Sequence, residues 1–522
     1  MKKLIAVLAS VIISLPLFSM DFELSLMPQV DFHLQSFFQT SVSGALSFDV
    51  YPFTFFERNK VGFSLQGGLA AIKAQTLNTS PLYYGDIALN YYYRFSDRFA
   101  AGLQAYAGLW TYPPVKEKNT ESMSGILFGS KVFADFYILP EFKAGLFFGF
   151  SDFYYRPEAF TKRLEAGINL KYSFSKGIFG KSGVVLDEYN VEPVFPVFYS
   201  FYNDNAFGKV SFYNEEENKI TDVSVSVLIP KYMVILKECG HFDVIERNQA
   251  FEVDLRAFLN ETILESLALH SSEGKLIVSY RSLGKKVSYE KIIDFSILSR
   301  NSMNWDDDRK AAAFVSSHDG AANKISKYAK TLILKNPQND YSFNMQMARA
   351  LFATLKAYGL SYVRDPTSPF SSEATRDVDF LQFPYQTLLY SGGDCDDLAI
   401  LNCALFESVG ISTAFITVPG HIFMAFDSGL AVEKAPSVIT DGRYIVQDGK
   451  VWIPLEITCV QEAFAMERSA GYNQWKNSSK KGEAKLYPLS DAWKLYKPVS
   501  IPESDAQIDL PAESLVIKYL KN

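Results

Sequence analysis

A cysteine and a histidine in the last third of this 522-residue chain have the types and spacing of a nucleophile and its base. Cys395 follows Gly392-Gly393-Asp394 and opens an apolar run of helical period, which predicts a loop, an N-cap and a helix start. Unpaired N–H groups and the positive end of the helix dipole favour a thiolate there. His421 opens a predicted strand 26 residues later. The pair predicts acyl transfer, in which the thiolate attacks an acyl carbon and the imidazole carries the proton.

Such a pair needs an acid that orients the imidazole, and two carboxylates compete for that role. Asp427 lies six residues beyond His421 on the same predicted strand, roughly 20 Å away at about 3.3 Å per residue. Glu456 lies on the second strand of a hairpin, Lys450–Ile457, which the turn signal Asp448-Gly449 predicts. A neighbouring strand can place a carboxylate beside the histidine. The sequence therefore favours Glu456 over Asp427.

Four sequence blocks around these residues resemble bacterial transglutaminase-like domains, which belong to the papain-like cysteine enzyme superfamily. The resemblance covers roughly residues 310–490 and implies a Cys–His–acid triad of Cys395, His421 and Glu456. Many members of the family have Asp where this chain has Glu456. An oxyanion hole would use the backbone N–H of Cys395, with Gln382 as a candidate second donor. The blocks are Val378-Asp379-Phe380-Leu381-Gln382-Phe383-Pro384, Gly393-Asp394-Cys395-Asp396-Asp397-Leu398, Pro419-Gly420-His421-Ile422-Phe423 and Trp452-Ile453-Pro454-Leu455-Glu456-Ile457-Thr458.

Three aspartates, Asp394, Asp396 and Asp397, flank the candidate thiol, and their charge opposes thiolate formation. They also suit the cap and the first turn of the predicted helix, and this structural interpretation is the favoured one. A calcium site is not expected, because the spaced oxygen ligands of such a loop are missing. No cofactor and no metal are predicted. The four cysteines are too few and too scattered for a disulfide framework or a zinc site: Cys239, Cys395, Cys403 and Cys459.

The N-terminal third predicts export and a membrane barrel. Lys2 and Lys3 precede an apolar run from Leu4 to Phe18, which is typical of a signal peptide over residues 1–20. In the eight segments that follow, aromatic and apolar residues alternate with polar ones, and about 9–11 residues suffice for a tilted strand to cross a bilayer. A soluble barrel or sandwich also alternates, but the aromatic outer set behind a signal peptide favours a transmembrane barrel. The segments lie near 22–32, 41–53, 60–73, 86–95, 98–110, 125–139, 142–153 and 164–174.

The predicted fold class is therefore multidomain. Residues 21–178 are expected to form an eight-stranded transmembrane antiparallel β-barrel, which resembles outer-membrane protein A-like barrels by pattern only. Residues 180–300 have shorter strands and charged turns, which suit an Ig-like β-sandwich. Residues 305–495 turn helical and then hold the four blocks, so they are expected to form an α+β transglutaminase-like domain. Residues 496–522 form a C-terminal tail to which no role is assigned.

The connections between strands predict an orientation. Those after strands two, four and six are short, at Glu57-Arg58-Asn59, Ser96-Asp97-Arg98 and Pro140-Glu141, whereas those after strands one, three, five and seven are expected to be longer. Outer-membrane barrels place short turns in the periplasm, and an even strand count leaves both barrel ends on that side. The expected localisation is the cell outer membrane, with the C-terminal domains in the periplasm.

Together these features predict an outer-membrane-anchored protein with a periplasmic cysteine acyl-transfer domain. The acceptor is left open: water would make an amidase or peptidase, and an amine would make a cross-linking enzyme. The expected partners are outer-membrane lipid and a protein or peptide substrate, with the cell wall as one possible source. The net charge of −7 gives no hint of a nucleic-acid partner. Two other functions compete, a catalytically silent periplasmic scaffold and a barrel that acts as a surface adhesin. An eight-stranded barrel is normally filled by side chains, so conduction is not expected.

Overall fold

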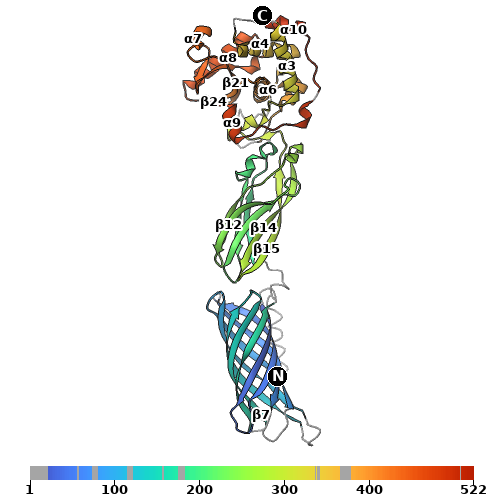
Figure 1. Ribbon diagram of the computed structural model, residues 1–522, viewed down its shortest axis with the longest axis vertical. Coiled ribbons are helices and arrows are strands. Elements are labelled where there is room, and N and C mark those ends of the chain that lie inside the picture. The colour runs from blue at the N-terminus through green and yellow to red at the C-terminus, as the bar shows by residue number, and fades with distance from the viewer. Residues whose placement is uncertain are drawn as a thin grey trace.

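The computed structural model describes residues 21–521, apart from 56–57, 73–79, 114–121, 156–157, 174–182, 336, 338–340, 365–377 and 506. The signal peptide predicted over residues 1–20 lies outside the described residues. The chain forms a barrel, a pair of sheets and a C-terminal domain, which follow one another along the longest axis (Figure 1). Among the described residues, no helix is long and apolar enough to cross a membrane.

The N-terminal part is a closed antiparallel barrel of eight strands in sequence order, and β1 pairs with β8 to close it. This confirms the predicted strand count and closure. Alternate residues of each strand point outward, and Leu65, Ile87 and Leu109 are each more than half exposed. Inward residues are buried and are mostly polar, aromatic or small, with a few aliphatic ones such as Leu82 and Leu127. The strands are β1 (Asp21–His33), β2 (Ser41–Phe55), β3 (Asn59–Ile72), β4 (Ser80–Arg94), β5 (Phe99–Tyr112), β6 (Met123–Tyr137), β7 (Phe142–Tyr155) and β8 (Glu158–Ser173).

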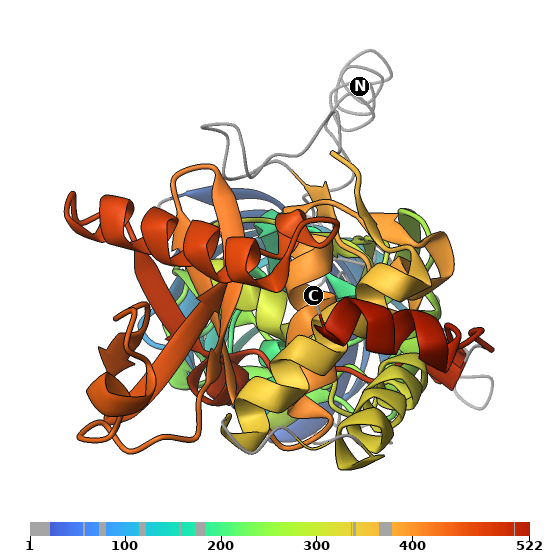
Figure 2. The same cartoon turned by 90° about the horizontal axis from the view of Figure 1, so that it is seen from above.

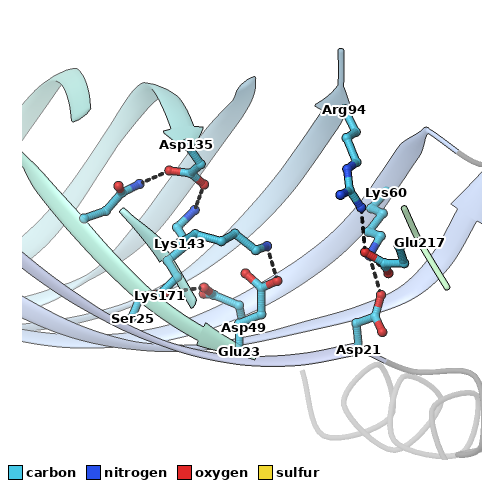
Figure 3. Close-up of polar contacts among 11 residues, drawn as sticks. Asp21, Glu23, Ser25, Asp49, Lys60, Arg94, Asp135, Lys143, Lys171 and Glu217 are labelled. Carbon is cyan, nitrogen blue, oxygen red and sulfur yellow. Dashed lines mark hydrogen bonds and ion pairs between the residues drawn. The ribbon is translucent and has the colours of Figure 1, made fainter. Parts of the chain in front are cut away.

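Ion pairs fill the inside of the barrel. Lys171 Nζ lies 2.8 Å from Asp135 Oδ2, and Lys143 pairs with Glu23 one layer away (Figure 3). Further along, the Arg163 guanidinium lies 3.1 Å from Asp31. A cavity inside the barrel, lined by Lys171, Lys131 and Asp49 among others, measures about 20 Å³, which is space for about one water molecule. The barrel is thus packed with paired charges rather than hollow.

One expectation about the barrel connections is wrong. The connection after the seventh strand was expected to be long, but β7 ends at Tyr155 and β8 begins at Glu158. The reason is that both strands extend past their predicted ends, and the register continues from Asp152–Lys162 to Tyr155–Glu158 across a bulge. The charged residues at the start of β8 favoured a loop in the sequence, although they belong to the strand.

The barrel end that carries the short turns also carries the next part of the chain. Glu217, in the turn after β10 (Gly208–Asn214), lies 2.8 Å from Lys60 Nζ and 2.9 Å from Arg94 Nη1 (Figure 3). A second turn contributes Leu283, whose side chain packs against the barrel core and whose carbonyl accepts from Arg98 at 3.3 Å. Two separate turns therefore attach the middle region to the barrel.

The middle region contains two antiparallel sheets, with strand orders β13-β10-β9 and β12-β11-β14-β15. Both contribute to one core, with Phe212 from the first sheet and Val225 and Phe295 from the second fully buried. The assignment of this region to an Ig-like β-sandwich stays a prediction. The strands are β9 (Val184–Val191), β10, β11 (Ile220–Leu228), β12 (Lys237–Ile245), β13 (Ala250–Leu255), β14 (His270–Ser282) and β15 (Lys285–Ile297).

The C-terminal part is built around a buried helix, α6, which packs against a five-stranded sheet of order β22-β23-β21-β20-β24. Other helices cover it, and Figure 2 shows this end of the molecule from above. The helices are α3 (Gly320–Lys335), α4 (Phe343–Tyr358), α5 (Pro384–Tyr390), α6 (Cys395–Glu407), α7 (Ala435–Val438), α8 (Phe464–Ser479), α9 (Leu489–Leu495) and α10 (Glu513–Lys521). The strands are β16 (Ser302–Met303), β17 (Ser361–Tyr362), β18 (Asp379–Phe380), β19 (Gly392–Gly393), β20 (Thr413–Val418), β21 (His421–Asp427), β22 (Ile445–Gln447), β23 (Lys450–Leu455) and β24 (Lys485–Pro488).

Candidate active site

Cys395 is the first residue of α6, as the sequence predicts, and Asp394 is the N-cap. The Asp394 carboxylate accepts from the Asp397 N–H at 3.5 Å, while the Asp397 carboxylate accepts from the Asp394 N–H at 3.4 Å. This reciprocal capping box satisfies two N–H groups at the helix start. Gly393 is needed before it, because a Cβ there would lie 2.5 Å from the Asp397 Cβ. The local sequence thus fixes where the helix begins, with the thiol in its first turn and 9% exposed.

His421 and Glu456 meet directly. His421 Nε2 donates to Glu456 Oε2 at 2.8 Å, and the carboxylate is almost fully buried. The antiparallel pairing of β21 with β23 brings Met424 opposite Leu455, so the residue after β23 reaches the start of β21. The other Glu456 oxygen accepts from the Thr458 hydroxyl at 2.6 Å. The carboxylate is therefore held on both sides.

The predicted position of Glu456 needs one correction. It was expected inside a strand running to Ile457, but β23 ends at Leu455 and Glu456 caps the 3₁₀ helix Ile457–Cys459. The hydroxyl and N–H of Thr458 turn the chain out of the sheet at this point. Asp427, the rejected acid, lies at the far end of β21 and forms an ion pair with Lys450 at 3.3 Å.

The charges around His421 favour the imidazolium. Burial by itself lowers the pKa of His421, but hydrogen bonds to Cys395 and Glu456 and the negative charges of both groups raise it to about 10. Because Nε2 is engaged by Glu456, Nδ1 is the ring nitrogen left for the thiol. The arrangement can hold a thiolate beside a protonated imidazole, which is the reactive form of a cysteine nucleophile.

The three aspartates around the thiol carry less negative charge than their number implies. Burial, followed by a hydrogen bond and the charge of Asp394, raises the pKa of Asp396 well above its ordinary value. Burial and the charge of Asp394 also raise the pKa of Asp397 to about 7. Their oxygens lie within 4.8 Å of one another. The opposition to the thiolate that the sequence suggested is correspondingly weaker at neutral pH.

Gln382 is tied to the start of α6 by its backbone. Its N–H donates to Asp397 Oδ1 at 2.7 Å. The amide oxygen Oε1 is buried and has no hydrogen-bond partner in the part of the chain that the structure describes. The structure thus brings Gln382 to the helix that carries Cys395, and its role as an oxyanion donor stays a prediction.

Two further residues adjoin the cluster without a sequence signal. Tyr362 lies close to the thiol because β17 pairs in parallel with β19, and burial together with the charges of Cys395 and Asp394 raises its pKa. Glu467, near the start of α8, accepts the Glu456 N–H with its backbone carbonyl at 3.0 Å. Burial and the charge of Glu456 raise the pKa of the Glu467 carboxyl. A two-residue strand and a buried acid on a helix have no period or spacing that would reveal them.

Comparison with known proteins adds little to this geometry. No family model matches the chain, and no curated protein matches it. The solved structures similar to it include Ail, the attachment invasion locus protein of Yersinia pestis, with 12% identity and a TM-score of 0.22, covering 30% of this chain and 97% of Ail. Neisserial surface protein A has 8% identity, a TM-score of 0.22 and coverages of 29% and 96%. The N-terminal β-barrel domain of OprF from Pseudomonas aeruginosa has 9% identity, a TM-score of 0.20 and coverages of 29% and 97%. The strand pairing within this chain itself defines the barrel.

Proposed function

We propose that this protein is an outer-membrane-anchored cysteine acyltransferase or amidase, with a transglutaminase-like domain in the periplasm. The observation that carries the proposal is the cluster at the start of α6. It places Glu456 2.8 Å from His421, with the Cys395 thiol close enough to raise the pKa of that histidine. Nucleophile, base and orienting acid are the three roles that acyl transfer through a thioester requires.

The reaction proceeds in two steps. The Cys395 sulfur attacks the carbonyl carbon of an amide, and the protonated His421 gives its proton to the departing amine, which leaves a thioester. Water or a second amine then attacks the thioester, His421 takes the acceptor's proton, and the thiolate is released. Glu456 holds the ring in one tautomer throughout. The Cys395 N–H and Gln382 are the candidates to stabilise the oxyanion in both steps.

The barrel supports the membrane part of the proposal. Its outward side chains form an apolar surface, with Val42, Leu103 and Leu146 each more than half exposed. Strands of 13–16 residues exceed the roughly 9–11 that a tilted membrane strand needs. The rest of the chain attaches at the short-turn end, which faces the periplasm in outer-membrane barrels. The site would then work in the periplasm.

The test is selective alkylation of the full chain by iodoacetamide at pH 7, with each cysteine followed by mass spectrometry. Cys395 should react at least about tenfold faster than Cys459, whose pKa burial raises, and His421→Gln should remove that advantage. Cys459 is a suitable internal comparison because it is half-buried, whereas Cys403 is fully buried. Equal rates for Cys395 and Cys459 would reject the enzyme and leave a silent scaffold.

A further inference from the structure

A pocket of about 420 Å³ lies in the C-terminal domain, and its lining includes none of Cys395, His421 and Glu456. One wall is a single face of α4, where Met345, Arg349, Phe352 and Lys356 recur at intervals of three or four residues. The opposite wall is the segment 461–465 that leads into α8. The volume falls within the range of about 300–1,000 Å³ that small-molecule sites occupy.

The pocket walls carry an excess of positive charge. Arg349, Lys356 and Arg468 line it, against the single carboxylate of Glu462. Lys356 is fixed in place, since its ammonium donates to the Gln461 carbonyl at 2.7 Å. These cations are held by helices that also contact the sheet or one another, so their charge is positioned before any ligand arrives.

Among the pocket cations, Arg468 has donors to spare. Its guanidinium has five N–H donors. It makes one long contact, from Nη2 to Asp441 Oδ1 at 3.4 Å, and its Nε is buried without a hydrogen-bond partner in the described part of the chain. The side chain is only 18% exposed, so water does not fully replace the missing bonds. Its Nη1 makes no hydrogen bond to the described residues, so an anion in the pocket would find a charged donor there.

Aromatic side chains complete the pocket. Phe352 and Phe464 contact each other in its wall, with ring centroids 5.6 Å apart, and Tyr341 and Tyr519 also line it. The Arg349 guanidinium lies 4.9 Å from the Tyr341 ring. An apolar or aromatic group of a ligand would find matching walls here, next to the cationic side chains.

We propose that this pocket binds a small organic carboxylate that also bears an aromatic or branched aliphatic group. The carboxylate pairs with the Arg468 guanidinium, whose planar fork matches two carboxylate oxygens, and the apolar group packs against Phe352 and Phe464. The proposal concerns a second site and does not depend on the reactivity of Cys395.

The test compares two probes that differ only in the charged group, N-acetyl-L-phenylalanine and its neutral amide. Binding to the purified full chain in detergent micelles is measured by saturation-transfer NMR. The carboxylate should bind at least about tenfold more tightly than the amide, as expected for a charge-assisted pair. Arg468→Gln should abolish the preference, and Arg468→Lys should retain part of it because the charge remains.

The matched control is Lys494→Gln, which removes an exposed cation on α9 outside the pocket and should leave the preference unchanged. Near-UV circular dichroism of each variant checks that the domain is folded. If Arg468→Gln fails this check, the comparison of wild type with Arg468→Lys decides. Equal binding of the two probes to the wild type, or a preference that neither Arg468 variant reduces, would overturn the proposal.

Discussion

The barrel interior and the candidate active site both bury charged groups, but they treat them in opposite ways. In the barrel, several buried carboxylates face cations, as Asp135 faces Lys171 and Asp31 faces Arg163, although Asp86 has no such partner among the described residues. At the start of α6, carboxylates gather beside one another, and burial raises the pKa of Asp396 and Asp397. Complementary charges serve an anchor, whereas crowded like charges are typical of sites that do chemistry. The comparison distinguishes the barrel, where paired charges stabilise the structure, from the start of α6, where the charges could take part in a reaction.

The largest expected effect comes from breaking one barrel pair. Glu23→Gln leaves the Lys143 ammonium buried without its charged partner, and both side chains are only 3% exposed. We expect the free energy of unfolding to fall by about 3–5 kcal/mol, measured by chemical denaturation in detergent micelles. Glu252→Gln is the matched control, because its pair with Lys209 is more than half exposed and is worth about 0–1 kcal/mol. Similar losses in both variants would contradict the role given to buried pairs.

A smaller effect is expected where α8 packs against β23. A Cβ at Gly471 would lie 2.9 Å from the Glu456 nitrogen and 3.0 Å from the Leu455 carbonyl carbon, which are backbone atoms. Gly471→Ala should push the helix outward, lower stability by about 1–3 kcal/mol and displace the acid beside His421. Thermal unfolding and the alkylation rate of Cys395 report the two effects. The exposed Asn473→Ala on the same helix should change neither, and an unchanged Gly471→Ala would show that the helix is not positioned by this contact.

The charge of Glu456 should be visible in the titration of His421. Glu456→Gln keeps the shape of the side chain but removes a charge that raises the pKa of His421, so that pKa should fall by at least about one unit, as NMR would record. A histidine whose pKa rises from 6.5 to about 10 on folding stabilises the protein below pH 6.5, and this contribution disappears as the pH rises toward 10. The variant should lose part of that pH dependence, because Cys395 still raises the pKa of His421. A pKa near 10 that persists in the variant would contradict the pairing.

The smallest effect concerns the aspartates. A carboxyl whose pKa is raised on folding keeps a proton that the unfolded chain has released, so stability falls as the pH rises above about 4. For Asp397 this loss continues to a pH of about 7. Asp396→Asn removes one buried acid and should make the domain more stable at pH 7, by about 1 kcal/mol, with little change at pH 4. A loss of stability at both pH values would mean that the Asp396 carboxylate is needed as a hydrogen-bond acceptor.

Sequence patterns predicted the elements whose formation depends on neighbouring residues, namely the barrel strands and the start of α6. Alternation located the eight barrel strands, and Asp394 before an apolar helical run placed Cys395 at a helix start. Residues 311–335 carry apolar residues at helical spacing, which predicts one helix, but the structure has the 3₁₀ helix Asp308–Phe314 followed by α3. Asp319 accounts for the new start, because its carboxylate accepts from the Ala322 N–H at 2.8 Å. In the sequence, a polar residue such as Asp319 can be either a helix cap or an exposed residue inside a helix, and the apolar spacing does not distinguish the two.

The misses at the site share a different cause. Tyr362 comes near Cys395 only through the pairing of two-residue strands, and Glu467 comes near Glu456 only through the packing of α8 on β23. Cys395 and His421 could be proposed from residue type and spacing, because a cysteine at a helix start followed by a histidine at a strand start is an uncommon pattern. Buried neighbours that modify their charge are ordinary residues until the tertiary structure brings them close.

The attachment of the middle region to the barrel has a mechanical consequence. Glu217 and Leu283 contact the barrel end at two separate points. Two contacts restrict the rotation of the middle region relative to the barrel more than one contact would. The two sheets of the middle region then act as a rigid spacer between the barrel and the C-terminal domain. Their length is roughly 40 Å, judged from the 13 residues of β14. On a barrel embedded in a bilayer, such a spacer would hold Cys395 at a set distance from the lipid. A substrate would have to present its amide at that distance from the membrane. The distance would therefore select among substrates before the shape of any pocket did.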